Sequence, residues 1–315
     1  MTPPTLTLLI DSLQPADGAW PSLPALQQLL SKGERSPLES DYYRVLCGLF
    51  GLAGGAQTLP LASLSALGDG LDSSDGWWLR ADPVHLVADR DQLYLSAYQT
   101  LHISQSEAER LAAELNRTYE EDGWRFHVPH PSRWYLQLPA PLAMQTVPTA
   151  TAMGSPVREV LPRGEDAMTW QRVMTEIQMV LHASPVNAER GVTGELAVNS
   201  LWFWGGGALP EAGTRPEWGQ LLTDEPLALG LAQLYGIPVV TAAAGGQTLQ
   251  IGTARSVTAA EEGVFAPALS RLRNGELQTV ELLLPGHGRW RIDRRALRRW
   301  WRRSQPLEKL LGAAP

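Results

Sequence analysis

The chain begins with a short apolar run that ends in a carboxylate. Residues 6–11 have the sequence LTLLID, and an unbroken apolar run of this length predicts a strand that is buried on both faces. Such a strand delivers the residue after it to the carboxyl edge of a sheet, where open α/β sheets bind their ligands. Asp11 is therefore the first candidate functional residue.

Helical spacing follows directly after this strand. In residues 23–34 the apolar positions recur at the interval of one helical face, and Gly33 is a typical end residue. The same reasoning predicts further helices over residues 40–52, 168–184 and 225–236.

The middle of the chain combines strands with one sharply delimited helix. Residues 77–96 favour strands, with a turn around 89–91. Ser104 and Glu107 form a capping-box pattern at the start of a helix whose buried face is formed by Ala108, Leu111, Ala112 and Leu115. Two short strands are expected within 124–138, and the Pro/Ala/Thr-rich residues 139–162 are typical of a linker. Residues 90–150 therefore predict a small α+β insertion.

An aromatic strand beside three glycines is the most unusual pattern in the chain. Trp202 and Trp204 alternate with Phe203, which predicts a strand covered on both faces. Gly205, Gly206 and Gly207 follow, and two interpretations stay open: a tight turn after a buried strand, or backbone N–H groups that bind an anion. Two more strands are expected, at 238–242 and at 277–285.

Composition narrows the class of protein. The chain has 315 residues, 44% of them hydrophobic, which is enough for a substantial core. Its single cysteine, Cys47, excludes an intrachain disulfide and a cysteine-based zinc site, and it fits a reducing compartment. The first residues carry no Lys or Arg and only a short apolar run, so we expect neither a signal peptide nor a membrane span, and we predict a cytoplasmic location.

Charge is distributed unevenly along the sequence. The formal net charge is −7, but residues 289–303 hold eight arginines and one aspartate, a local charge of +7 that leaves −14 for the remainder. Such a basic segment is suited either to a partner or to docking on the protein's own acidic surface.

Four stretches together resemble one enzyme family. They are LTLLIDSL at the start, residues 79–116, residues 186–207 and DEPLALGLAQLYGIP at 224–238. Their order is similar to that of the archaeal-type cofactor-independent phosphoglycerate mutases of the alkaline phosphatase superfamily. A closer resemblance is to a proteobacterial regulatory group, the RpfE-like proteins. The resemblance implies an α/β fold: a three-layer α/β/α alkaline-phosphatase-like core with a small α+β inserted domain.

The departures from this family concern its metal centre. The family uses two divalent metals held by Asp and His ligands, together with a serine nucleophile. Asp11 stands where the resemblance places the first metal-binding carboxylate, but Ser12 and Leu13 replace the usual glycine-containing continuation. After residue 230 the only histidine is His287, and no Asp-His pair occurs anywhere in the chain. We therefore predict that the dinuclear site and its cofactor are absent, with Asp11 as the only catalytic or metal candidate and Mn or Mg as the alternative cofactor.

No residue stands out as a nucleophile. Ser40 and Cys47 precede the predicted insertion, but neither lies in a motif of the family. Cys47 lies on an apolar helix, which favours a small buried hydrophobe over a reactive thiol.

Several polar residues are candidates for ligand contact. Polar side chains flanking a core strand need partners, and arginine suits bidentate binding of carboxylate or phosphate. Arg80 also has a structural alternative, an ion pair with Asp82, and His85 is interpreted as a hydrogen-bonded strand histidine. The predicted ligand-binding set is Asn187, Arg190, Asn199, Gly205, Gly206 and Arg80.

The arginine-rich end offers a third kind of function. Ile292, Leu297, Trp300 and Trp301 lie among the arginines at helical spacing, and a basic aromatic helix can bind nucleic acid. Two points argue against it: the acidic remainder repels a polyanion, and the two tryptophans can instead anchor the helix to the core.

These observations combine into one prediction. The predicted domains are a first core part at 1–89, the insertion at 90–150, and a second core part at 151–315 that ends in an arginine-rich helix. The predicted function is a non-catalytic regulatory relative of phosphoglycerate mutase that binds a small phosphorylated or anionic metabolite, or a protein partner. The first alternative is an active mutase or metal-dependent phosphohydrolase, and the second is a nucleic-acid-associated regulator.

Overall fold

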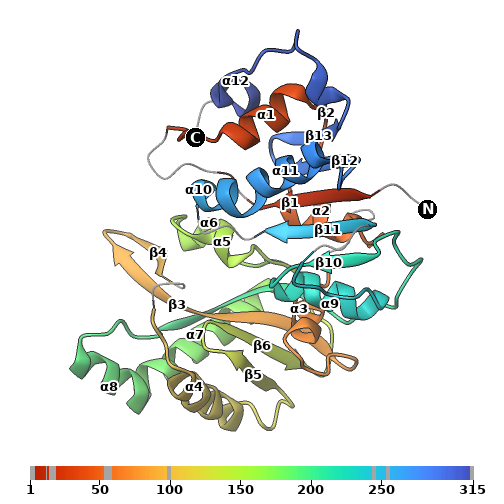
Figure 1. The fold of residues 1–315 in the computed structure, drawn as a ribbon. Coiled ribbons are helices and arrows are strands. Elements are labelled where there is room, and N and C mark those ends of the chain that lie inside the picture. The colour runs from red at the N-terminus through yellow and green to blue at the C-terminus, as the bar shows by residue number, and fades with distance from the viewer. Residues whose placement is uncertain are drawn as a thin grey trace. The chain divides into compact units, whose positions relative to one another are not determined.

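The chain forms two compact units. The computed structural model describes residues 4–11, 13, 19–52, 59–97, 101–242, 246–252 and 256–312. Unit 1 combines Met1–Gly55 with Ala212–Pro315, and unit 2 is the continuous stretch Ala56–Glu211 (Figure 1). The predicted insertion, 90–150, lies within unit 2.

Unit 1 is built on a six-stranded mixed sheet. The strand order is β10-β11-β1-β12-β13-β2, in which β1, β10, β11 and β12 run parallel and β13 and β2 run antiparallel to their neighbours. The strands are β1 (Thr5–Ile10), β2 (Glu34–Ser36), β10 (Gln220–Leu222), β11 (Gln247–Gly252), β12 (Thr279–Leu284) and β13 (Gly288–Asp293). The strands predicted at 6–10 and 277–285 are confirmed.

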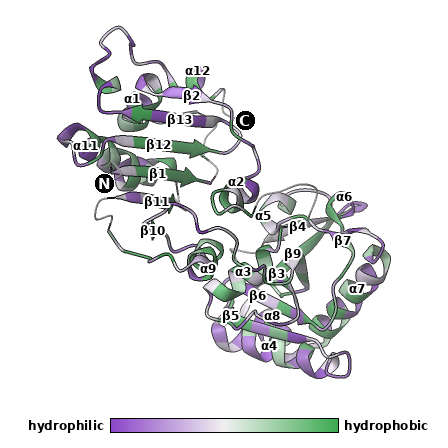
Figure 2. Ribbon diagram, turned by 90° about the vertical axis from the view of Figure 1, so that its right-hand side faces the viewer, coloured by the Kyte–Doolittle hydropathy of each residue, from purple (hydrophilic) through white to green (hydrophobic). Residues whose placement is uncertain are grey.

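Both faces of this sheet are covered. Leu6, Leu8 and Ile10 of β1 belong to the main apolar core, whereas Leu9 is buried on the opposite face. The core is completed by α1 (Pro24–Lys32), α10 (Val257–Ala260), the π-helical turn Glu261–Phe265, α11 (Ala266–Asn274) and α12 (Leu307–Leu311). Figure 2 shows that hydrophobic residues predominate in β1 and β12, as expected for parallel strands buried on both faces.

The remaining helices of unit 1 also follow the sequence pattern. They are α2 (Tyr42–Gly48) and α9 (Pro226–Tyr235). The helices predicted over 23–34, 40–52 and 225–236 are therefore confirmed, with Gly33 as the residue that caps α1.

Unit 2 contains a separate antiparallel sheet. The long strand β3 (Trp77–Asp89) pairs with β4 (Gln92–Ala97), β6 (Arg133–Leu138) and β9 (Ser200–Gly207), and β6 also pairs with β5 (Arg125–His130). Its longer helices are α3 (Leu61–Gly68), α4 (Gln105–Thr118), α7 (Ala167–Ala183) and α8 (Pro185–Thr193). Helices α3 and α7 both pack on β9, which is why every residue of that strand is buried.

Two local predictions in unit 2 are confirmed by their geometry. The turn between β3 and β4 falls at Arg90, which has a positive φ of 55°. The capping box forms as predicted, because the Ser104 side chain accepts from the Glu107 backbone N–H while the Glu107 carboxylate accepts from that of Ser104.

The prediction of a linker at 139–162 is wrong. This stretch contains β7 (Met144–Gln145), α5 (Thr149–Ala152) and α6 (Val157–Val160), followed by β8 (Arg163–Gly164), which pairs with β7. Thr149 is buried and donates to Asp82, and the Val147 carbonyl accepts from the Trp202 indole. Proline-rich composition indicated a flexible chain, but tertiary hydrogen bonds hold this segment on the sheet.

The three consecutive glycines do not form a turn. Gly205, Gly206 and Gly207 are the last residues of β9 and are buried. A Cβ on Gly206 would lie 3.0 Å from Leu79 Cδ2, and one on Gly207 would lie 2.6 Å from Pro60 Cα. Close packing therefore requires glycine at Gly207, and a positive φ of 70° beside an irregularity in the β3–β9 register favours it at Gly205.

Two predictions near the end of the chain are also wrong. Residues 238–242 form only an isolated bridge, between Val239 and Leu221, instead of a strand. The predicted arginine-rich helix is instead β13 followed by the short 3-10 helix Ala296–Arg298. In 288–293 the apolar and arginine residues alternate, and that period of two selects a strand.

The fold class is thus mixed α/β, as predicted, with a six-stranded mixed sheet and a separate antiparallel sheet. Among the described helices, none combines the length and apolar character needed to span a bilayer.

Candidate functional site

Asp11 lies where the sequence placed it. It follows β1 directly, at the edge where the parallel strands of unit 1 end. Partial burial raises the pKa of its carboxyl group. Ser12, which follows it, lies outside the described residues.

A second carboxylate lies near Asp11 and is already hydrogen-bonded. Glu225, the residue before α9, accepts a hydrogen bond from the Tyr42 hydroxyl. Burial, together with the charges of Glu225 and Asp11, raises the pKa of Tyr42 well above its ordinary value. Tyr42 therefore stays protonated, and its hydroxyl donates a hydrogen bond to the Glu225 carboxylate.

Neither candidate nucleophile gains activation from its surroundings. Burial, followed by the charges of Glu225 and Asp41, raises the pKa of Cys47 to about 12. Because the thiolate is the reactive form, this environment suppresses nucleophilic chemistry at Cys47. Ser40 is an exposed residue just before α2.

His287 also lies at the carboxyl edge of the parallel strands. It follows β12, which is the direct neighbour of β1. Its Nδ1 lies 2.9 Å from the Leu311 carbonyl oxygen, which can only accept. The proton therefore belongs to Nδ1, and the ring is held toward α12.

This arrangement does not fit a pair of divalent metals. Two-metal phosphoryl transfer needs several carboxylate and imidazole ligands converging on two ions. Within the described ranges no group of three or more His, Cys, Asp or Glu side chains is positioned to hold a metal ion. At the edge itself, Glu225 accepts from Tyr42, and His287 donates its Nδ1–H to Leu311 and keeps Nε2 available. One imidazole and the carboxylates Asp11 and Glu225 are fewer ligands than two ions need.

The polar candidates on α8 and before β9 tie unit 2 together. The Asn187 amide donates to the carbonyls of Leu181 and Val198 and accepts from the Val198 N–H. The Asn199 amide donates to the Leu86 carbonyl and accepts from its N–H, at 2.8 and 2.7 Å. These bonds explain why asparagine is found at both positions.

Arg190 is buried in a similar role. Only 2% of its surface is exposed. Its guanidinium donates to the carbonyls of Leu196 and Leu101 and to the Glu107 carboxylate, at 2.8, 2.5 and 2.8 Å. Arg190 therefore joins α8 to the start of α4. Ligand contact by Asn187, Asn199 or Arg190 stays a prediction.

Arg80 is the centre of a larger polar network. Its guanidinium contacts Asp82 at 2.5 Å and lies 5.1 Å from the centre of the Trp204 ring. Asp82 is buried and also accepts from Thr149 and from the Trp204 indole, at 2.6 and 2.7 Å. The structural pair of Arg80 and Asp82 is present, as is the carbonyl contact of His85, whose Nδ1 lies 2.7 Å from the Ala197 oxygen.

The network continues through residues that sequence reasoning missed. Asp69, just after α3, accepts two hydrogen bonds from Arg133, at 2.5 and 2.7 Å, and one from the Tyr135 hydroxyl. Tyr135 is also hydrogen-bonded to Ser65, and the Arg80 guanidinium lies 5.2 Å from its ring centre. Arg133 and Tyr135 are two positions apart in β6 and therefore lie on the same face of the strand. This spacing of two polar residues in a predicted strand was the sequence signal that could have identified them.

His130 lies within electrostatic reach of these groups. Burial lowers its pKa, and the charges of Arg133 and Arg80 lower it further, while Asp69 acts in the opposite direction. The side chains of Arg80 and Arg133 are 12% and 24% exposed. Unit 2 therefore presents two fixed, partly accessible guanidinium groups on the neighbouring strands β3 and β6.

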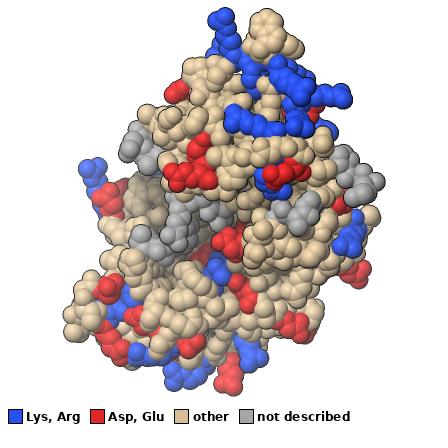
Figure 3. Space-filling model, in the orientation of Figure 1, with Lys and Arg blue, Asp and Glu red and all other residues tan. Residues whose placement is uncertain are grey.

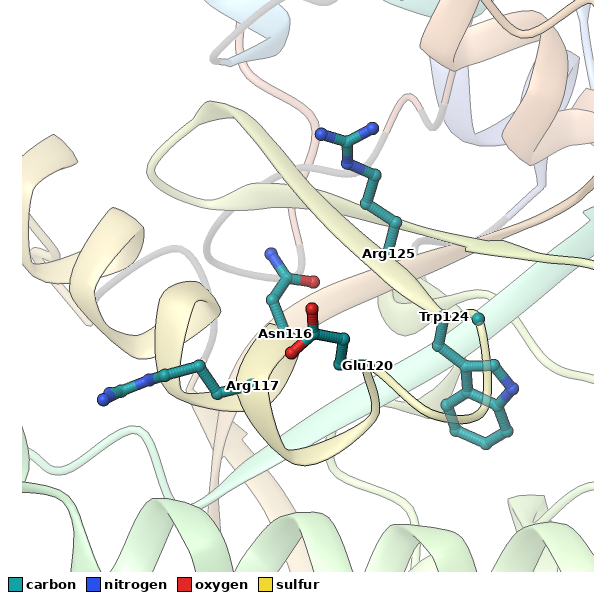
Figure 4. Close-up of a pocket in the computed structure, with 6 residues that line it drawn as sticks. Asn116, Arg117, Glu120, Trp124 and Arg125 are labelled. Carbon is teal, nitrogen blue, oxygen red and sulfur yellow. The ribbon is translucent and has the colours of Figure 1, made fainter.

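A separate pocket in unit 2 contains none of the predicted residues. Its volume is about 460 Å³, and Figure 4 shows the side chains that line it, with Arg117 and Arg125 pointing in different directions. The Asn116 amide is used by the backbone of Phe126, to which it donates and from which it accepts. Because the two guanidinium groups point in different directions, they do not form a common binding site for one anion.

Comparison with known proteins gives matches in the middle of the chain. The profile of the family described as 2,3-bisphosphoglycerate-independent phosphoglycerate mutase matches residues 61–187, a stretch that lies within unit 2. A probable 2,3-bisphosphoglycerate-independent phosphoglycerate mutase of Geobacter sulfurreducens is 27% identical over 195 residues, which is 59% of this chain and 48% of that protein. The corresponding enzyme of Methanosarcina mazei is 30% identical over 116 residues, 36% of this chain and 29% of that enzyme.

Two solved structures are also similar. The cofactor-independent phosphoglycerate mutase of Thermoplasma acidophilum has a TM-score of 0.44 and 16% identity, covering 92% of this chain and 89% of that one. The PH0037 protein of Pyrococcus horikoshii has a TM-score of 0.49 and 16% identity, covering 90% and 81%.

The sequence matches make this chain a distant homologue of the cofactor-independent phosphoglycerate mutases of archaeal type. The aligned part spans about half or less of the curated relatives, 48% and 29% of their lengths.

Proposed function

We propose that this protein is a phosphoglycerate-mutase-like regulator, of the RpfE-like kind, that binds a small anionic or phosphorylated metabolite without two-metal phosphoryl transfer. One observation supports the proposal: the carboxyl edge of unit 1 carries two carboxylates, Asp11 and Glu225, and both act on Tyr42. Glu225 accepts the Tyr42 hydroxyl, whose proton is held by burial and by the neighbouring charges.

The chemistry of phosphoryl transfer gives this observation its weight. A phosphate dianion approaching an edge that carries Asp11 and Glu225 meets like charge unless cations lie between them. Of the imidazoles in the sequence, only His287 belongs to unit 1, and because its Nδ1–H donates to Leu311, it offers one nitrogen, Nε2, to a metal. A regulator that has kept the framework and lost the metal ligands accounts for this combination.

The arginines of unit 2 support the binding half of the proposal. Asp82 and Asp69 hold Arg80 and Arg133 in fixed orientations, so little side-chain entropy is lost when an anion binds their exposed edges. Guanidinium groups are also the preferred partners of carboxylate and phosphate.

The proposal that the protein does not carry out two-metal phosphoryl transfer is tested by counting bound ions and measuring turnover. Protein stripped with a chelator is offered manganese, magnesium or zinc, and bound ions are counted by native mass spectrometry. Interconversion of the phosphoglycerates and release of phosphate from phosphoester substrates are measured in parallel. We expect no tightly bound pair of ions and no turnover. Two ions per chain with turnover that is lost in Asp11→Asn would establish the enzyme instead.

The proposal that the protein binds a small anionic metabolite is tested by calorimetry with 3-phosphoglycerate and with inorganic phosphate. Arg133→Lys keeps the charge but loses the two parallel hydrogen bonds to Asp69, so we expect weaker binding by a variant that circular dichroism shows to be folded. The matched control is Arg158→Lys, an exposed arginine of unit 2, which should bind like the wild type. Equal binding by both variants would place the ligand elsewhere.

A further inference from the structure

Residues 289–303, here called the Arg/Trp segment, form an exposed basic surface on unit 1. In β13 the apolar side chains Trp290 and Ile292 are buried, while Arg289 and Arg291 between them are exposed. Beyond β13, Arg294, Arg295, Arg298 and Arg303 are also exposed. Figure 3 shows Lys and Arg side chains gathered over the end of unit 1 that holds β13. The strand alternation of the sequence therefore produces a basic face.

The last two tryptophans of the segment do not anchor it. Trp300 and Trp301 are 83% and 63% exposed, and their rings meet edge to face with centres 6.0 Å apart. Exposed apolar area of this size has an unfavourable hydration free energy, and it usually marks a binding surface. Trp290 and Ile292 anchor the start of the segment in the core, and polar contacts at the end of α1 anchor its last residues.

These polar contacts fix the backbone that carries the tryptophans. Arg302 donates to the carbonyls of Lys32 and Gly33, at 3.2 and 2.8 Å. The Lys32 ammonium donates in return to the carbonyls of Arg299 and Arg302. Arg299 pairs with Glu34 at 2.9 Å. The exposed rings are thus presented on a held loop.

A pocket lies beside these rings. Its volume is about 660 Å³, and the groups that line it include Trp301 and four cationic side chains, Arg35, Arg302, Arg303 and Lys309. The Arg35 guanidinium also lies 5.1 Å from the centre of the Trp290 ring. A ligand complementary to this surface has both negative charge and a flat ring.

The distribution of charge between the units removes the main objection from the sequence. Unit 1 holds 16 Lys and Arg against 14 Asp and Glu, a net charge of +2, whereas unit 2 holds 10 against 19, a net charge of −9. The acidic excess therefore lies in unit 2 and not around the Arg/Trp segment. A polyanion that reaches unit 1 meets a net positive unit with a strongly positive surface.

We propose that the Arg/Trp segment binds single-stranded nucleic acid, with arginines on the phosphates and bases stacked on Trp300 and Trp301. Exposed rings among cations are the usual means of binding unpaired bases without sequence preference. Duplex DNA offers the same phosphates but keeps its bases stacked, so it gives the tryptophans no partner. This proposal goes beyond the regulator function and concerns a different surface.

The test is fluorescence anisotropy of a labelled oligothymidylate with the full chain. We expect saturable binding that weakens between about 50 and about 200 mM salt. The double variant Trp300→Ala/Trp301→Ala should bind about tenfold more weakly or worse, because base stacking is lost. The double variant Arg298→Gln/Arg303→Gln should also bind more weakly and have a smaller salt dependence.

A matched control distinguishes the effect of the Arg/Trp segment from the effect of a lower total charge. The double variant Arg158→Gln/Arg163→Gln removes two exposed arginines from unit 2 and should bind like the wild type. Circular dichroism checks that every variant is folded.

Three results would overturn the proposal. They are absence of saturable binding at low salt, equal binding by the tryptophan variant, and equal affinity for duplex DNA or heparin. The last would show a purely electrostatic surface, and the first would direct attention to an acidic protein partner.

Discussion

The buried arginine of unit 2 and the exposed arginines of unit 1 have opposite roles. In unit 2, Arg190 is 2% exposed and donates to two carbonyls and a carboxylate, and Arg80 and Arg133 are held by buried or nearly buried aspartates. In unit 1, the Arg/Trp segment places most of its arginines in water, next to two exposed tryptophans.

The contrast shows that the role of a guanidinium group depends on whether it is hydrated. A guanidinium taken out of water must replace its hydration by hydrogen bonds, so it becomes part of the framework and its removal leaves carbonyls and carboxylates without partners. A guanidinium in water contributes little to stability and remains available to a polyanion. The buried Arg190 therefore supports folding, whereas in our proposals the partly exposed Arg80 and Arg133 and the exposed arginines of the Arg/Trp segment bind anionic ligands.

The largest expected effect compares one arginine from each unit. Arg190→Met should lower the free energy of unfolding by about 3 kcal/mol, because two carbonyls and the Glu107 carboxylate lose a buried donor. Arg298→Met, on the exposed segment, should leave the urea midpoint unchanged. Urea unfolding followed by circular dichroism measures both. Equal losses in the two variants would break the comparison.

A smaller effect is expected from the close packing inside unit 2. Gly207→Ala should cost about 1–3 kcal/mol, because the new methyl group would overlap Pro60 ahead of α3. The control is Gly191→Ala in α8, where a Cβ meets nothing within 4 Å. It should stabilise the protein by about 0.5–1 kcal/mol, since alanine is the better helix former. Tolerance of Gly207→Ala would mean that α3 does not approach β9 as closely as described.

The smallest effect is a pH dependence located in unit 2. His127 stacks on Trp78 with ring centres 5.1 Å apart, and burial lowers its pKa below the ordinary value of 6.5. The unfolded chain then binds the proton more readily, so this contribution to stability is present above about pH 6.5 and is lost as the pH falls toward the folded pKa. Urea midpoints measured across this range should fall less steeply for His127→Gln than for the wild type. Parallel pH profiles would exclude His127 as the source.

Much of the local structure could be predicted because its signals are local. The apolar run before Asp11, the periodic leucines of α1 and the capping box of Ser104 and Glu107 depend on residues within a few positions of one another. Alternation in β13 was also present in the sequence, but the spacing of Ile292, Leu297, Trp300 and Trp301 over the longer segment suggested a helix there.

The candidate site was only partly predictable, because its partners are distant in sequence. Asp11 could be placed from its strand, but the pairing of Tyr42 with Glu225 joins residues 183 positions apart. Asp69, Arg133 and Tyr135 likewise meet across more than sixty positions. No periodic pattern encodes such contacts, which depend on how the strands are ordered and paired.

By itself the sequence determined the elements with strong local periodicity and the mixed α/β class, since these follow from residue type and short-range spacing. Only the tertiary structure decided which polar groups are engaged and which face water. The three glycines lie in a packed strand, and the proline-rich stretch is hydrogen-bonded to a sheet. Two tryptophans are exposed among arginines. The physical reason is that burial and desolvation depend on residues brought together by the fold, and these set whether a side chain holds the structure or meets a ligand.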